Sequence, residues 1–311
     1  MVHHSYPDVS VVIPTRNRAH MLGRALRSAL AQTTQPSEII VVDDGSSDES
    51  RLVVEAFGSD LVRYVSHENQ QGASAARNAG VDLARSELLA FLDDDDEWLP
   101  EKLEKMSAVM SRSSPEVCAV YCGVHVIGPS NEVASTWTPG REPRVIGDFL
   151  QSTGFMTSVP IIRRDCLTAV GSFDEDLPGG QDFDLWIRLA QHYAFVPVPA
   201  VLVRHHIHGG QITTDRRAKL LSKRAVLEKH RTLFERHPAA YAHQLERLGM
   251  LNCANGLFDE GRECFRQSLR LDPTRETARE HLRQSTDDME AHQHTLLRKV
   301  FSQVEGIGRF Y

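Results

Sequence analysis

The chain lacks several features that would place it in a specialised class of protein. No stretch approaches the roughly 20 apolar residues that a membrane-spanning helix needs, and residues 1–7 contain no basic region leading into an apolar run. The five cysteines are few and odd in number, and Cys118 and Cys122 have no second pair at zinc-finger spacing. These absences argue against a membrane-spanning protein, a disulfide scaffold and a zinc finger. We expect buried, reduced thiols in a cytoplasmic protein.

Positive charge is also scarce. The 311 residues include 35 Lys and Arg against 42 Asp and Glu, which gives a formal net charge of −7 and a pI near 6.1. This balance argues against a protein whose main partner is nucleic acid. The deficit of positive charge lies in residues 1–214, which have 17 basic and 28 acidic side chains. Residues 215–311 have 18 basic and 14 acidic side chains. Length and charge together predict a domain over residues 1–214 and an extension over residues 215–311.

Short apolar runs alternate with helical periodicity through the first hundred residues. The pattern predicts strands over 9–13, 38–42, 61–65 and 88–92, and helices over 17–30 (with Asn17 as its cap), 48–57 and 73–85. Strands that alternate with helices in this way indicate an α/β fold, with a mainly parallel sheet and helices on both faces. Buried parallel strands are typically continuous Val, Ile and Leu runs, as these are.

Beyond residue 115 the pattern is less regular, and after Asp215 it is entirely helical. We expect strands over 117–127, 159–162 and 201–206, a helix over 181–191, and a loop over 128–145. One tetratricopeptide-like hairpin is predicted at about 242–273, from Gly249, Gly261, Phe265, Ser268 and Pro273 at the offsets of that repeat. The last segment, 295–311, is apolar and basic. A docking helix is favoured there over a helix on a membrane surface.

Acidic residues directly follow two of the predicted strands. Asp43 and Asp44 come after the second strand, and four aspartates, 93–96, follow the strand at 88–92. Because parallel strands present their carboxyl ends at one edge of a sheet, these carboxylates should share one crevice. They would repel each other unless a cation or hydrogen-bond donors compensate. The pattern therefore favours a Mg²⁺ or Mn²⁺ site over a merely solvated acidic loop.

The sequence has no glycine-rich phosphate loop. Neither the G-x-x-x-x-G-K-[ST] motif nor a G-x-G-x-x-G motif follows the first strand, whose end is Pro-Thr-Arg-Asn-Arg (14–18). A bound phosphate would instead need a metal ion and side chains such as Arg77. That arginine lies at the start of a helix, behind the small residues 72–76, where an anion can approach closely.

Five segments occur in a recognisable order. VSVVIPTRNR, IIVVDDGSSD, NQQGASAARNAG, LLAFLDDDDEWLPEKL and GGQDFDLWIRLA resemble the family 2 inverting glycosyltransferases. The resemblance covers about residues 8–214. It implies a GT-A fold, which is Rossmann-like, followed here by an all-helical extension. It also implies transfer of a sugar from a nucleotide-sugar donor, UDP-linked by expectation, with Mn²⁺ or Mg²⁺ as cofactor.

The resemblance also implies roles for individual residues. The expected donor-binding residues are Thr15, Arg16, Asp43, Asp44, Arg77, Asp93 and Asp94. The expected metal ligands are Asp95 and His208, with His205 and His206 competing for the histidine position. The expected general base is Asp182, with Asp184 as an alternative. Gln181 stands where the family has a glutamate, which removes one charge near the acceptor. Asp96 could belong to the acidic cluster or cap a helix starting at 97–100.

The acceptor is less defined than the donor. A carbohydrate, a lipid-linked molecule or a protein could serve, and polysaccharide or glycoconjugate synthesis is the expected setting. A lipid-linked acceptor would be met at the inner face of the membrane, with peripheral contact through the C-terminal helices. Two other functions stay open. A nucleotidyltransferase would want a glycine-rich loop that is absent here, and a non-catalytic scaffold is left open by Gln181.

Overall fold

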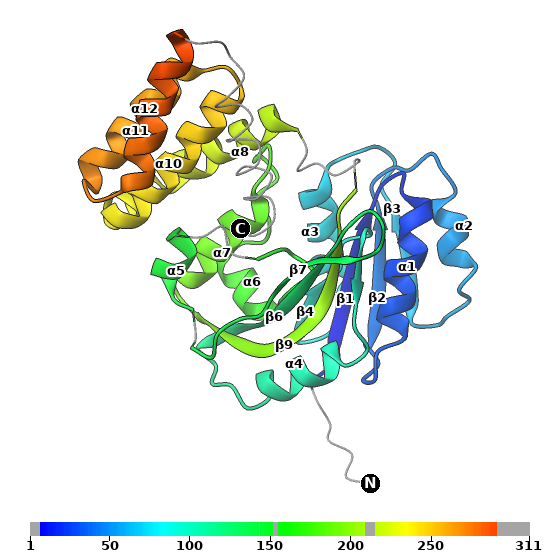
Figure 1. Cartoon of the computed structure of the whole chain (residues 1–311). Helices are drawn as coiled ribbons and strands as arrows, with labels where there is room; N and C mark the ends of the chain where they lie inside the picture. The colour runs from blue at the N-terminus through cyan, green and yellow to red at the C-terminus, as the bar shows by residue number, and fades with distance from the viewer. Residues whose placement is uncertain (1–6, 143, 152–154, 209–214, 291–311) are drawn as a thin grey trace. The chain divides into compact units, whose positions relative to one another are not determined.

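The structure, a computed structural model, describes residues 7–142, 144–151, 155–208 and 215–290 (Figure 1). The described chain forms two compact units. The sheet unit contains residues 7–142, 144–145, 155–175 and 188–208, and the helical unit contains 146–151, 176–187 and 215–290. The helical unit thus includes two segments that the sequence analysis grouped with residues 1–214.

One sheet organises the sheet unit. Its strands are β1 (Val9–Thr15), β2 (Glu38–Asp43), β3 (Val62–Ser66), β4 (Leu88–Phe91), β5 (Asp96–Trp98), β6 (Val117–Ile127), β7 (Val133–Trp137), β8 (Ile161–Arg163) and β9 (Ala194–His206). They are ordered β3-β2-β1-β4-β8-β6-β9-β5, and β7 pairs with β6 (Figure 1). The predicted α/β fold is confirmed.

The first half of the sheet is parallel throughout. Strand β1 pairs in parallel with β2 on one side and β4 on the other, and β2 pairs in parallel with β3. Nearly every residue of β1, β2 and β4 is buried. The continuous Val, Ile and Leu runs of the sequence are therefore the two-sided core that they predicted.

Helices connect these strands. The sheet unit contains α1 (Ala19–Leu30), α2 (Ser50–Glu55), α3 (Ala73–Leu83), α4 (Lys102–Met110) and α6 (Arg164–Val170). Right-handed crossovers place α3 on the opposite face of the parallel strands from α1 and α2 (Figure 1). Asn17 does not cap α1, because its φ is +51° and its Oδ1 accepts the Ser47 N–H at 2.8 Å. The α1 amide of Ala19 donates instead to Asp48 Oδ2 at 2.9 Å.

The second half of the sheet is mixed: β6 pairs with β9 in parallel, while other pairs are antiparallel, so the sheet as a whole stays mainly parallel, as expected. Strand β8 runs antiparallel to both β4 and β6, and β5 runs antiparallel to β9. Two strands were missed. Residues 133–137 were predicted as loop, and residues 96–98 as the start of a helix, whereas α4 begins only at Lys102. Strands of three to five residues carry too little periodicity to be recognised without their partners.

The helical unit is built from α5 (Ile146–Gln151), most of α7 (Gln181–Ala190), α8 (Arg216–Lys229), α9 (Arg231–Glu235), α10 (Pro238–Ala254), α11 (Phe258–Leu271) and α12 (Glu276–Glu290). Phe183, Ile187, Val226 and Phe234 are among the buried residues of its core. None of the helices in the described part of the chain has the length and apolar character needed to cross a bilayer. The predicted terminal helix, 295–311, lies outside the described residues.

The predicted hairpin corresponds to α10 and α11. A Cβ atom on Gly249 would come within 2.5 Å of the Phe265 ring and 3.0 Å of the Gly261 carbonyl oxygen. Gly261 faces the Gly249 carbonyl in the same way, and the buried Ser268 donates from Oγ to the Ala242 carbonyl at 2.7 Å. The small residues that suggested the repeat therefore allow the two helices to approach closely.

Gly249→Ala should destabilise the helical unit by about 1–3 kcal/mol, because the added methyl overpacks the contact with Phe265. Urea denaturation followed by circular dichroism measures this loss. Gly147→Ala is the matched control, since a Cβ on Gly147 in α5 meets nothing within 4 Å. Alanine there should raise stability slightly through helix propensity. Equal stability of the two variants would contradict the close approach.

Candidate functional site

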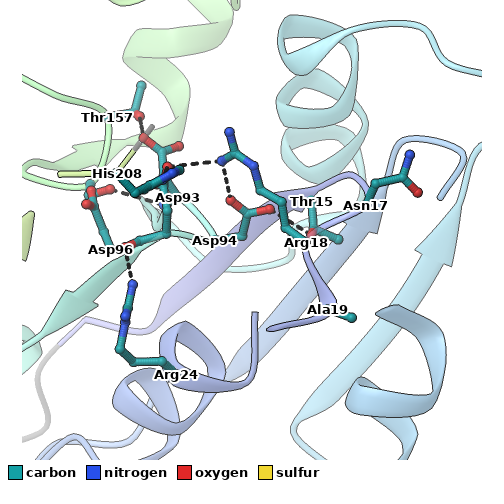
Figure 2. Close-up of polar contacts among 12 residues, drawn as sticks. Thr15, Asn17, Arg18, Ala19, Arg24, Asp93, Asp94, Asp96, Thr157 and His208 are labelled. Atoms are coloured by element: carbon teal, nitrogen blue, oxygen red, sulfur yellow. Dashed lines mark hydrogen bonds and ion pairs between the residues drawn. The ribbon is translucent and has the colours of Figure 1, made fainter. Parts of the chain in front are cut away.

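The acidic run after β4 lies at the carboxyl end of the parallel strands. Because β1 and β4 are parallel neighbours with Val12 opposite Phe91, the turn after β1 meets residues 93–96. Thr15 Oγ1 donates to Asp94 Oδ2 at 2.8 Å, as Figure 2 shows. Asp94, Asp95 and Asp96 are all at most 7% exposed. The acids of the run after β4 therefore lie buried beside the turn after β1, and a solvated loop is excluded; that Asp43 and Asp44 share the same crevice stays a prediction.

An arginine that the sequence analysis did not select neutralises this cluster. Arg18 Nη1 lies 2.8 Å from Asp94 Oδ1 (Figure 2), and it lies 3.0 Å from Asp95 Oδ2. Further along α1, Arg24 Nη2 donates to the Asp95 carbonyl oxygen at 2.6 Å. The signal was available in the sequence, because Arg18 belongs to the same strand-end turn as Thr15 and Arg16. Arg16 itself is exposed and makes no hydrogen bond or ion pair among the described residues.

Asp93 has its own set of partners. Arg77 Nη2 lies 2.6 Å from Asp93 Oδ1. Thr157 Oγ1 donates to Asp93 Oδ2 at 2.8 Å (Figure 2). Burial would raise the pKa of Asp93, but Arg77 and the Thr157 hydrogen bond lower it below the usual value. Asp93 is therefore a fixed anion. No sequence pattern identified Thr157, because it reaches the site from the segment before the short strand β8.

The two central acids, Asp94 and Asp95, both have raised pKa values. Burial raises the pKa of Asp94 to about 6, even though Arg18 acts in the opposite direction. The pKa of Asp95 is raised by burial and by the neighbouring carboxylates of Asp96 and Asp93. A negative charge at Asp95 is thus disfavoured by its surroundings, although His208 and Arg18 act in the opposite direction.

Three histidines in β9 and just after it each lie against a different acid. Asp96 lies opposite His205 in this antiparallel pair, and His205 Nδ1 is 2.8 Å from Asp96 Oδ1. Burial opposes protonation, but Asp96 raises the pKa of His205 to about 9. Two further acid–histidine pairs follow: His206 Nε2 lies 3.4 Å from Glu97 Oε2, and His208 Nε2 lies 2.9 Å from Asp95 Oδ2. Asp96 is therefore a strand residue paired with His205, which corrects the helix-cap alternative.

The acids after β2 form a separate cluster. Asp44 accepts the backbone N–H groups of Gln71 and Gly72, each at 2.8 Å, and lies 2.9 Å from His67 Nδ1. Burial opposes ionisation, but these donors lower the pKa of Asp44. Asp43 is buried and accepts the Tyr64 hydroxyl at 2.7 Å. The sequence analysis missed His67, which has no motif around it.

The two candidate bases differ in environment. Asp184 is fully buried, with Lys229 Nζ at 2.7 Å and His230 Nε2 at 2.8 Å from its Oδ1. Through these contacts Asp184 holds α7 against α8 and α9. Asp184 is therefore excluded as the alternative general base. Asp182 is partly exposed, and its Oδ1 accepts the Phe183 N–H at 2.7 Å. It belongs to the helical unit.

The chemistry of the donor set at Asp95 suits a hard divalent cation. Asp95 Oδ2 and His208 Nε2 lie 2.9 Å apart, and Asp95 is buried beside the carboxylates of Asp93 and Asp96, which raise its pKa. Among the described residues, no three or more His, Cys, Asp or Glu side chains come together as a metal cluster. Two protein ligands are enough where a substrate phosphate supplies the others, as Mg²⁺ sites often show. The residues therefore fit a cation that is bound together with a phosphorylated ligand.

Arg18→Gln should destabilise the chain by about 2 kcal/mol, because Asp94 and Asp95 would lose their shared cation while staying buried. Urea denaturation at neutral pH measures the change. Arg27→Gln removes the same charge from an exposed position on α1 and should have almost no effect. If both variants unfold alike, the guanidinium does not compensate the acids.

The known proteins compared below are all glycosyltransferases. Residues 10–166 match the model of the family described as "Glycosyl transferase family 2". An uncharacterised glycosyltransferase of Rickettsia prowazekii is 30% identical over 214 residues, which cover 67% of this chain and 66% of that protein. The chain therefore spans just under two thirds of that relative's length. In Escherichia coli, the UDP-Glc:alpha-D-GlcNAc-diphosphoundecaprenol beta-1,3-glucosyltransferase WfgD is 27% identical over 181 residues, covering 58% of this chain and 69% of WfgD.

A solved structure agrees in fold. The mannosyltransferase PcManGT from Pyrobaculum calidifontis, in complex with GDP-Man and Mn²⁺, matches with a TM-score of 0.62. The sequences are 18% identical, and the match covers 98% of this chain and 87% of that one. At this identity the likeness concerns the fold alone.

Proposed function

We propose that this chain, which belongs to glycosyltransferase family 2 and is a glycosyltransferase, is a metal-dependent inverting enzyme that uses a UDP-sugar. Its product would be a glycosidic bond to an acceptor hydroxyl in polysaccharide or glycoconjugate synthesis. The observation that carries the proposal is the buried acidic cluster at the carboxyl ends of β1 and β4, where Arg18, Arg77 and His208 meet Asp93–Asp96.

The donor side of the proposal rests on two groups of residues. Thr15, Arg16, Asp43 and Asp44 would bind the nucleotide, and Asp93, Asp94 and Arg77 would contact ribose, sugar or diphosphate. The two carboxylate oxygens of Asp44 already accept backbone donors and remain ionised, which makes Asp44 a strong acceptor for a base N–H. The name of the E. coli relative supports UDP as the nucleotide.

Asp95 and His208 would hold the divalent ion. A bound Mn²⁺ or Mg²⁺ supplies charge stabilisation for the departing diphosphate. The Mn²⁺ in the P. calidifontis complex supports this assignment. Arg18 and Arg77 would add fixed positive charge at the same end of the sheet, where it costs no reorganisation as negative charge develops.

Asp182 would act as the general base. A hydroxyl is a weak nucleophile near pH 7, so one carboxylate must take its proton as the new bond forms. Attack from the side opposite the leaving diphosphate inverts the anomeric carbon and needs no covalent intermediate on the protein. Asp182 suits this role because its carboxylate is partly exposed, unlike the buried Asp184.

A nucleotide panel tests the proposal directly. Thermal-shift measurements with UDP-, GDP- and other nucleotide sugars, with and without Mn²⁺, should give the largest stabilisation for a UDP-sugar with Mn²⁺ present. Slow donor hydrolysis under the same conditions would identify an active transferase rather than a scaffold. Pyrophosphate release from a nucleoside triphosphate would instead favour a nucleotidyltransferase and overturn the proposal.

The acceptor is proposed to be a lipid-linked carbohydrate, which the name of the E. coli relative supports. Carbohydrate without lipid and protein are the other acceptor classes. Peripheral membrane contact through residues 295–311 stays a prediction, because that segment lies outside the described residues. Transfer assays with isolated lipid-linked and water-soluble acceptors would distinguish these classes.

A further inference from the structure

Asp93 is more exposed than the three aspartates that follow it. Its side chain is 26% exposed, whereas the side chains of the other three are at most 10% exposed. Asp93 is therefore the carboxylate of the run 93–96 that a ligand can reach most readily. The direction in which this carboxylate is held decides how well it can accept hydrogen bonds from a ligand.

Two consecutive residues before β8 hold Asp93. Thr157 Oγ1 donates to Asp93 Oδ2 at 2.8 Å (Figure 2). The Asp93 N–H donates to Ser158 Oγ at 3.1 Å. Both Thr157 and Ser158 are buried. Thr157 thus sets the direction of the carboxylate, with Arg77 on its other oxygen, and Ser158 holds the main chain of the same residue.

The indole of Trp98 holds these two residues in place. Trp98 Nε1 donates to the Ser158 carbonyl oxygen at 2.9 Å. Ser158 is therefore bound to Asp93 through its hydroxyl and to Trp98 through its main chain. Trp98 is itself buried, and its main-chain N–H donates to Ser28 Oγ of α1 at 3.1 Å. Hydrogen bonds thus connect α1, Trp98, Ser158 and Asp93 in that order.

Lys102 of α4 packs on the ring of Trp98. Lys102 is fully buried, and its Nζ lies 4.4 Å from the centre of the indole ring. Within the described residues this ammonium group has no hydrogen-bond partner. A cation is attracted to the face of an indole, and more strongly when both groups are removed from water. The contact favours one orientation of the ring and, with it, one direction of the indole N–H.

We propose that Trp98, Ser158 and Thr157 are positioning residues that orient the Asp93 carboxylate for the nucleotide-sugar donor. This inference rests on the proposed function, in which Asp93 contacts the donor. With one protein donor on each carboxylate oxygen, each oxygen keeps a lone pair for a hydroxyl of the ligand. A carboxylate that is already fixed loses less conformational freedom on binding, so the complex is tighter. The three residues act through Asp93 and do not touch the donor themselves.

Donor titration of the full chain tests this role. UDP and UDP-glucose, each with Mn²⁺, are titrated by calorimetry, and donor hydrolysis gives kcat and the donor KM. Thr157→Val keeps the shape of the side chain without its hydroxyl. It should weaken donor binding by about tenfold while changing kcat at saturating donor by less than about twofold. Thr157→Ser keeps the hydroxyl and should restore most of the affinity.

Thr168→Val is the matched control. Thr168 is exposed on α6, and its hydroxyl donates to the Arg164 carbonyl oxygen of the same helix. The variant makes the same chemical change in the sheet unit without altering a contact of Asp93, so it should bind both probes like the parent. Parent-like affinity of Thr157→Val would overturn the inference while leaving the proposed function intact. A parent that binds neither probe would overturn the proposed function and this inference with it.

A double variant separates positioning from folding. Trp98→Phe keeps a ring beside Lys102 without the indole N–H, and should weaken donor binding by about threefold. Because Trp98 acts through the residues next to Asp93, Trp98→Phe combined with Thr157→Val should bind only slightly more weakly than Thr157→Val alone. Thermal unfolding checks that each variant is folded before titration. Losses that multiply in the double variant would overturn the positioning role of Trp98.

Discussion

Asp182→Asn is expected to lower kcat by about 10³-fold while leaving donor affinity nearly unchanged. The amide has the shape of the carboxylate but cannot take the acceptor proton, and a positioned general base contributes about 10²–10⁴-fold. Folding should be preserved, because the amide oxygen can still accept the Phe183 N–H. Steady-state transfer kinetics with calorimetric donor titration would separate the two effects.

The control for this experiment is Asp60→Asn, an exposed position in the sheet unit that makes no hydrogen bond or ion pair among the described residues. It should match the parent in both assays. Reduced donor affinity in Asp182→Asn, with substantial transfer remaining at saturation, would reassign Asp182 to substrate positioning. Gln181→Glu restores the acidic pair typical of the family, and it should alter the acceptor KM more than kcat.

Asp95→Asn is expected to reduce transfer at least about a hundred-fold at every Mn²⁺ concentration. Metal stabilisation of a leaving diphosphate is worth several kcal/mol, and each 1.36 kcal/mol corresponds to tenfold in rate. The variant should nevertheless be no less stable than the parent. Burial and the carboxylates of Asp96 and Asp93 already disfavour a charge at Asp95, as its raised pKa indicates.

Two measurements check that Asp95→Asn loses metal-dependent activity while keeping its stability. The paramagnetic resonance signal of free Mn²⁺, recorded in the presence of a UDP-sugar, should show loss of metal binding in Asp95→Asn but not in Asp60→Asn. Urea denaturation without metal should show unchanged or higher stability. A variant that unfolds more easily and retains Mn²⁺ would mean that Asp95 is a structural acid and that the ion is bound elsewhere.

The sequence predicted the structure best for strands that are buried on both faces of the sheet. Strands β1, β2 and β4 were predicted within two residues at each end, because continuous Val, Ile and Leu runs leave few alternatives. The acidic cluster followed from topology alone. Parallel neighbours present their carboxyl ends together, so Asp93–Asp96 could be placed next to Thr15 before any contact was known.

Pairings between distant residues were beyond sequence reasoning. Thr157 carries no motif, and although Arg18 belongs to the turn after the first strand, its contact with Asp94 depends on a side-chain direction set by the completed fold. The pairing of His205 with Asp96 depends on the register of β5 with β9, and β5 itself was not recognised. The sequence left Asp184 open as an alternative to Asp182, and its burial against Lys229 became visible only in the structure.

Helix α1 holds Asp95 from two directions. Arg18, just before its first turn, contacts the side chain, and Arg24 in its second turn contacts the main-chain oxygen. The same helix is anchored by a stripe of fully buried residues such as Leu22 and Leu26. A conservative exchange in that stripe would rotate or shift both arginines together. Natural variation in apolar residues of α1 could thereby tune the affinity of the centre for its ligands without altering any group that touches them.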